Sequence, residues 1–70
     1  MPMKPVNMVR GIKYGLEERG LKKNIPLQLF YTEFMLQSGY GKKKILEWTE
    51  NFKILKLITV VDGEVNFTCS

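Results

Sequence analysis

The sequence predicts a single α+β domain that is mainly helical, with three helices followed by a C-terminal β-hairpin. Between residues 5 and 55, apolar side chains recur every three or four positions, which is the spacing of one face of an α-helix. From residue 57 onward they alternate with other residues around Asp62-Gly63, a dipeptide typical of two-residue hairpin turns. The 70 residues allow one domain, 1–70, and a hydrophobic content of 44% indicates a packed fold rather than a disordered tail.

The first helix is expected over residues 5–19. Its apolar stripe consists of Met8, Val9, Ile12 and Leu16. Gly20 stands where a left-handed residue closes a helix, and Leu21 can contact the last turn in a Schellman closure. Gly11 and Gly15 each cost about 1 kcal/mol of helix propensity relative to Ala, so we expect a neighbouring helix or strand to approach closely there.

The second helix is expected over residues 26–37, with Pro26 in its first turn and a connector before it that has room for a few strand-like residues. Its broad apolar arc consists of Leu27, Phe30, Tyr31, Phe34 and Met35, and the positions left for water are Gln28, Thr32, Glu33 and Gln37. Leu29 and Leu36 point to nearly the opposite side from that arc. They are candidates for a homodimer surface, and coverage by the first helix and the chain ends is an equal alternative.

The third helix is expected over residues 42–55, after a short turn at residues 38–41. Its expected core positions are Ile45, Trp48, Phe52 and Leu55. Glu47, Glu50 and Lys53 lie away from that stripe and are most simply a solvated face. No glycine marks the end of this helix, so Lys56 or its neighbour must take the closing position.

The hairpin is expected over residues 57–68. A two-residue loop pairs Val61 with Glu64, Val60 with Val65, Thr59 with Asn66, and Ile58 with Phe67. This register places the strongly apolar side chains on one face and polar ones on the other, with Val61 as the exception. Since a lone hairpin is unstable in water, the apolar face must pack on the helices.

The order of elements and the segment from Met35 to Trp48 resemble the winged helix-turn-helix family. The residues that carry the resemblance are Gly39 at the turn, Tyr40 as the apolar plug, Gly41 at the N-cap, and Ile45 and Trp48 as buried positions of the recognition helix. The resemblance covers almost all of the chain. It implies a three-helix winged helix-turn-helix domain whose wing is a two-stranded β-hairpin and whose helix 42–55 enters the DNA major groove.

Three consecutive lysines lie in the first turn of that helix. Cations there oppose the helix dipole by a few tenths of a kcal/mol each, so three together suggest an external anion. The resemblance implies that Lys43 meets a base or phosphate, that Lys42 and Lys44 clamp phosphates, and that the hydroxyls of Ser38 and Tyr40 donate to the DNA backbone. The expected DNA-binding set is Ser38, Tyr40, Lys42, Lys43, Lys44 and Glu47. Asp62 and Glu64 at the wing tip would repel phosphates, which argues against minor-groove reading by the wing.

Composition argues against an enzyme, a metal site or a cofactor. The chain has no His and a single cysteine, Cys69, and no glycine-rich loop has phosphate-binding spacing. No pair of carboxylates is placed for acid–base work, and no small-molecule ligand is evident. The apolar runs are far shorter than the roughly 20 residues that span a bilayer, and the N-terminus has no signal-peptide stretch, so we expect a cytoplasmic protein without a membrane partner.

The net charge of +4 favours a polyanionic partner. The function expected first is a small, sequence-specific binder of double-stranded DNA, a transcriptional regulator that binds as a homodimer through Leu29, Leu36, the first helix or the C-terminal strand. Its size would suit a stand-alone regulator of a small replicon or virus. The alternative is a winged-helix adaptor for protein–protein interaction without nucleic-acid binding, which the acidic wing and exposed Leu36, Leu46 and Ile54 would fit. RNA or single-strand binding has less support because few aromatic residues are expected at the surface.

Overall fold

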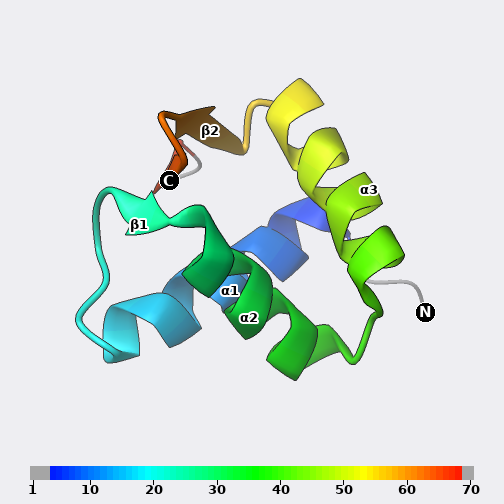
Figure 1. Cartoon of the computed structure of the whole chain (residues 1–70), viewed down its shortest axis with the longest axis horizontal. Helices are drawn as coiled ribbons and strands as arrows, with labels where there is room; N and C mark the ends of the chain where they lie inside the picture. Colours follow the sequence, from blue (N-terminus) through cyan, green and yellow to red (C-terminus); the bar gives the residue numbers. More distant parts are fainter. Residues whose placement is uncertain (1–3, 69–70) are drawn as a thin grey trace.

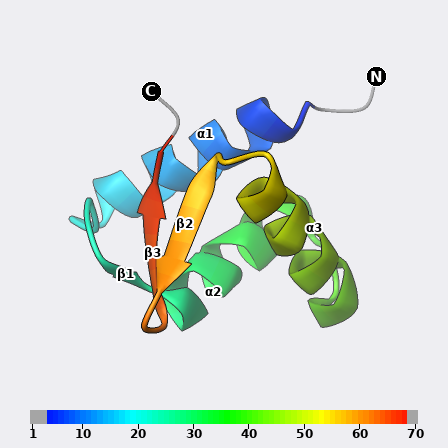
Figure 2. The same cartoon turned by 90° about the horizontal axis from the view of Figure 1, so that it is seen from above.

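Three helices pack against a small antiparallel sheet in a winged-helix-like layout (Figures 1 and 2), which confirms the predicted α+β class. The computed structural model describes residues 4–68. The elements are α1 (Pro5–Glu18), β1 (Ile25–Pro26), α2 (Leu27–Ser38), α3 (Lys42–Ile54), β2 (Ile58–Val61) and β3 (Glu64–Phe67). The first and third helices therefore end one residue earlier than predicted.

The hairpin of β2 and β3 has the register that the sequence predicts. The paired residues are Ile58 with Phe67, Thr59 with Asn66, Val60 with Val65, and Val61 with Glu64. Asp62 and Gly63 have φ values of 53° and 75°, and two successive left-handed residues are what a type I′ turn requires. Ile58 and Val65 are fully buried while Val61 is exposed, so the apolar face points into the core as expected.

A third strand, β1, adds to the sheet and corrects the expectation of a two-stranded wing. Ile25 pairs with Val65 and Pro26 with Glu64, so the strand order is β1-β3-β2. Pro26 was expected inside the second helix, but its ψ of 133° is extended and the helix begins at Leu27. An extended Pro26 lets Ile25 enter the core, and Leu27 N–H donates to the Gly63 carbonyl oxygen at 2.9 Å. The C-terminal strand thus lies in the middle of the sheet, where β2 pairs with its whole length on one side and β1 with Glu64 and Val65 on the other.

The core gathers apolar side chains from every helix and strand. Its buried members are Val9, Ile12, Leu16, Ile25, Phe30, Phe34, Ile45, Phe52, Ile58 and Val65. Phe34 stacks on Phe52 with ring centroids 5.5 Å apart, which ties α2 to α3.

Two apolar positions differ from the prediction. Leu55 is 54% exposed because α3 ends at Ile54 and Leu55 is its C-cap residue. The buried stripe of α3 instead includes Thr49, whose hydroxyl donates to the Ile45 carbonyl oxygen at 2.7 Å. Met35 is 41% exposed, since it lies on the side of α2 that borders α3 rather than on the side that faces the core.

The C-terminal ends of α1 and α3 close with the same motif. At α1, Leu21 N–H donates to the Leu16 carbonyl oxygen at 2.9 Å, and Gly20 has a φ of 83°, as a Schellman closure requires. At α3, Leu57 N–H donates to the Phe52 carbonyl oxygen at 2.9 Å, and the left-handed residue is Lys56, with a φ of 61°. Lys56 therefore takes the position that glycine usually fills.

The close approach expected at Gly11 and Gly15 is made by α2. A Cβ on Gly15 would lie 2.4 Å from Glu33 Oε2 and 2.7 Å from Gln37 Nε2, so the ends of both side chains would have to move to admit any other residue. Gln37 Nε2 donates to the Gly11 carbonyl oxygen at 2.9 Å and to Glu33 Oε2 at 2.7 Å. The contact between α1 and α2 at Gly11 and Gly15 is therefore made by polar side chains.

Glu33 was expected to face water, and this is wrong, because only 6% of it is exposed. Glu33 Oε1 accepts no hydrogen bond, but Arg19 Nε lies 3.1 Å from it. This ion pair offsets part of the cost of burying the carboxylate. The Gly11–Gly15 spacing of α1 and the Glu33–Gln37 spacing of α2 match, and each glycine leaves room for a polar side chain of the other helix.

Candidate nucleic-acid interface

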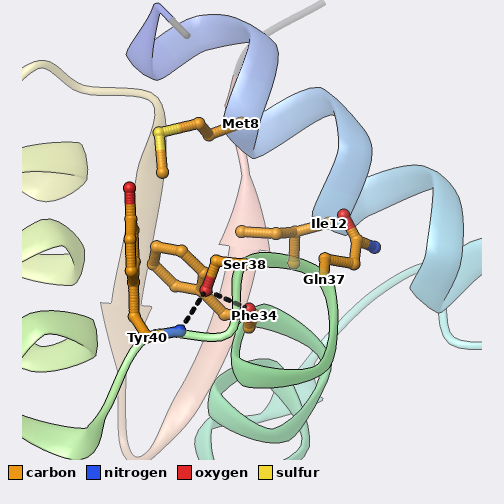
Figure 3. Close-up of a pocket in the computed structure, with 6 residues that line it drawn as sticks. All are labelled: Met8, Ile12, Phe34, Gln37, Ser38 and Tyr40. Carbon is orange, nitrogen blue, oxygen red and sulfur yellow. Dashed lines mark hydrogen bonds between the residues drawn. The ribbon is translucent and has the colours of Figure 1, made fainter. Parts of the chain in front are cut away.

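The turn between α2 and α3 is held by backbone and side-chain hydrogen bonds. Gly39, with a φ of 76°, ends α2, and its N–H donates to the Met35 carbonyl oxygen at 2.8 Å. The Ser38 hydroxyl donates to the Phe34 carbonyl oxygen at 2.7 Å and accepts from Tyr40 N–H at 3.1 Å (Figure 3). The turn therefore fixes the direction in which α3 leaves α2.

Tyr40 has the packing role that the sequence predicts. Its ring meets Phe34 edge-on, with centroids 6.2 Å apart, and the residue is half-buried. Ser38 is also half-buried, and its hydroxyl proton is already donated within α2. Of the expected DNA-binding set, these two residues are thus engaged in shaping the turn, and the Ser38 hydroxyl has no second proton to donate to a phosphate.

The first turn of α3 has no side-chain cap. Gly41 is the N-cap residue, with an extended backbone and no side chain to accept from the helix, and no acidic residue lies in that turn. Ile45 N–H is the first to bond back, to the Gly41 carbonyl oxygen at 3.0 Å, so the N–H groups of residues 42–44 have no helical partner. Such an end attracts anions through both free donors and the helix dipole.

The three lysines of that turn are exposed and available to a partner. Within residues 4–68, the ammonium groups of Lys42, Lys43 and Lys44 make no ion pair and no side-chain hydrogen bond. Lys42 also lines a groove between α2 and α3. The other residues of the groove are Gln28, Tyr31, Thr32, Met35, Ile45 and Leu46. The sequence did not predict this groove, although its α2 members recur at helical spacing.

Beyond the first turn, the outward face of α3 is not basic. At 100° per residue, Lys43, Glu47 and Ile54 share the side opposite the buried stripe, and Glu50 lies next to them. Glu47 is exposed, and Glu50 forms an ion pair with Lys53 at 3.1 Å. The unpaired positive charge of α3 therefore lies at the start of the helix, since Lys53 near its end is paired with Glu50.

The wing is short and folded back onto α2. Figure 2 shows the turn between β2 and β3 beside the start of α2, where Leu27 N–H bonds Gly63. Asp62 and Glu64 are exposed at this turn. Nothing in this arrangement extends a cationic arm toward a second groove of DNA.

Leu29 and Leu36 are exposed on α2, at 42% and 67%. They lie seven residues apart and so share one stripe of the helix. Neither α1 nor the described chain ends cover them, so the structure leaves this stripe open to a partner.

Comparisons with protein-family models, curated proteins and solved structures gave no match for this chain. No helix within residues 4–68 is long and apolar enough to cross a membrane. The same residues contain no group of three His, Cys, Asp or Glu side chains that would hold a metal ion, and Cys69 lies outside the described part of the chain. The fold and its side chains are thus the basis for a proposed function.

Proposed function

We propose that this protein binds double-stranded DNA, with the N-terminal turn of α3 as its main contact and the helix directed into the major groove. The observation that carries the proposal is the run of three unpaired lysines at an uncapped helix start. Their ammonium groups and the free N–H groups of the same turn offer a phosphate both charge and directed hydrogen bonds. The winged-helix-like layout supports the proposal because it presents this end of α3 at the surface beside the α2–α3 turn.

In this proposal Lys43 contacts a base edge or a phosphate, and Lys42 and Lys44 clamp phosphates on either side. Ser38 and Tyr40 hold the turn, and Glu47 faces the groove one helical turn further along. A Glu at that place can accept from a cytosine amino group and repels phosphate, so it favours sequence selection over tight non-specific binding. The role we propose for such a DNA binder is that of a cytoplasmic, dimeric transcriptional regulator.

The test is duplex-DNA binding measured at several salt concentrations. We expect log K to fall steeply with log salt, and the change of Lys42, Lys43 and Lys44 together to Ala to reduce that slope by about 2 to 3, since each lost phosphate contact contributes about 0.9. The matched control changes Lys13, Lys22 and Lys23 to Ala. It removes the same charge from α1 and the α1–β1 loop, and in Figure 1 that loop lies at the opposite side of the molecule from α3.

The control should retain most of the slope. The lysine turn is not a DNA site if the native protein binds no duplex at low salt. The same conclusion follows if both triple variants reduce the salt slope by the same amount.

A second candidate function is an adaptor for another protein, and the outward face of α3 favours it. Glu47 and Glu50 lie there beside the exposed Leu46 and Ile54, a mixture of acidic and apolar groups that suits a protein surface better than a polyanion. Absence of DNA binding, together with a partner whose affinity falls on changing Leu46 and Ile54 to Ser, would select this alternative.

A further inference from the structure

A pocket lies between α1 and the α2–α3 turn, outside the proposed DNA contact. Its six lining residues are Met8, Ile12, Phe34, Gln37, Ser38 and Tyr40. Figure 3 shows the Tyr40 ring along one wall, Ile12 on the opposite side, Phe34 between them and Met8 across the top. The pocket measures about 210 Å³ and is partly open to solvent, and about 150 Å³ is enough space for one benzene molecule.

The lining defines the chemistry of an occupant. None of the six residues is charged, so a carboxylate or an ammonium group in the pocket would lose part of its hydration and gain no ionic partner. The two aromatic rings and the Met8 thioether favour a flat aromatic ligand, because ring–ring and sulfur–ring contacts add to the burial of apolar area.

The polar groups of the lining are mostly engaged. Gln37 Nε2 bonds Gly11 and Glu33, and the Ser38 hydroxyl bonds Phe34 and Tyr40. The Tyr40 hydroxyl, in contrast, makes no hydrogen bond with any residue from 4 to 68. It is therefore free to donate to a ligand oxygen.

We propose that this pocket binds a neutral molecule built on one aromatic ring, with a hydrogen-bond acceptor that meets the Tyr40 hydroxyl. The site lies between α1 and the turn that precedes Lys42, so an occupant would contact both elements. An effect on DNA affinity would rest on the proposed function, whereas binding to the pocket does not. The two are measured separately below.

The experiment titrates benzyl alcohol, toluene, benzoate and benzylamine into the protein and follows amide and methyl resonances by NMR. For so small a ligand we expect benzyl alcohol to bind with a dissociation constant of about 1 mM. Its shifts should centre on residues 38–40 and on the methyl groups of Met8 and Ile12. Benzoate and benzylamine should bind more weakly, because the lining offers no ionic partner to offset the hydration that each charged group loses.

Two variants locate the ligand. Met8→Trp fills the cavity and should abolish the shifts, while the matched control Met35→Trp places the same ring in the separate α2–α3 groove and should leave them unchanged. Tyr40→Phe should weaken benzyl alcohol by about fivefold and leave toluene unaffected, since only the alcohol uses the hydroxyl. The backbone spectrum of each variant shows whether it is folded.

The proposal is overturned if benzyl alcohol gives no saturable shift at about 10 mM, if the shifts survive Met8→Trp in a folded variant, or if the charged analogues bind as well. Equal loss of benzyl alcohol and toluene in Tyr40→Phe would contradict the role given to the hydroxyl.

Discussion

Lys56 holds a backbone conformation that favours glycine. Its φ of 61° closes α3, and its side chain is exposed without an ion pair in the described residues. Lys56→Gly should therefore raise the free energy of unfolding by about 0.5 to 1 kcal/mol, because glycine adopts this region without steric cost. Chemical denaturation measures the change. The control Lys53→Gly, inside the helix, should lower stability by about 1 kcal/mol, and equal effects of the two changes would refute the closure described for α3.

Gly15 shows how one missing side chain positions two helices. Helix propensity alone predicts that Gly15→Ala stabilises the protein by about 1 kcal/mol. The structure predicts the opposite sign, a loss of about 1 to 3 kcal/mol, because the new Cβ would collide with the buried Glu33 carboxylate and the Gln37 amide. Gly11→Ala, where the nearest atom is Gln37 Oε1 at 3.0 Å, should cost less. A thermal or denaturant melt in which Gly15→Ala is stabilising would contradict the conclusion that the close approach of α1 and α2 depends on Gly15.

The start of α3 links stability to the proposed function. Gly41 already has the backbone of an N-cap residue, and a Cβ there meets nothing within 4 Å. Gly41→Asp should therefore stabilise the protein by about 0.5 kcal/mol through a cap and the helix dipole. The same carboxylate should weaken duplex binding, since it occupies the N–H groups proposed for phosphate and adds a negative charge.

Gly41→Ser separates these two effects. It should cap the helix without the charge, keep most of the added stability and cost less DNA affinity than Gly41→Asp. Tighter duplex binding by Gly41→Asp than by the native protein would exclude the helix start as the anion site.

Elements with a strict local pattern could be predicted from the sequence. Alternation around Asp62-Gly63 leaves one register that buries Ile58 and Val65, and that register is observed. The two residues of β1 have no periodicity to detect, and their pairing with β3 depends on contacts some forty residues apart.

The candidate site was predictable in position but not in its surroundings. Lys42 to Lys44 follow a turn signal, so their place at a helix start was apparent from sequence. The burial of Glu33 was not apparent, because a charged residue is buried only when partners reach it. Gln37 lies one turn further along the same helix, but Arg19 comes from the end of α1, and the sequence does not show that these two helices meet there. Leu55 was wrongly predicted to be buried because helical spacing assigns it to the apolar stripe, whereas the helix ends one residue before it.

Across the whole molecule, the lysine turn of α3 and the leucine stripe of α2 are separate surfaces. The unpaired lysines lie at the start of α3, while Leu29 and Leu36 form a stripe on α2 that neither α1 nor the described ends of the chain cover. A monomer with so few phosphate contacts would bind DNA weakly and with strong salt dependence. A second copy would double the lysine contacts, so dimerisation through the α2 stripe and DNA affinity should be coupled.

Sedimentation of the native protein should therefore show a dimer at micromolar concentration, and changing Leu29 and Leu36 together to Ser should give a folded monomer. The variant should keep its fold because both side chains are exposed and contribute little to the core. It should also lose the dependence of the melting temperature on protein concentration that a dimer shows.

The matched control changes Leu46 and Ile54 to Ser on α3. These side chains are exposed to a similar or greater extent, at 44% and 69%, so a loss of dimer in the control as well would indicate non-specific apolar association. A clean monomer of the native protein at high micromolar concentration would remove the interface assigned to Leu29 and Leu36, and would leave the lysine turn to bind DNA as a single copy.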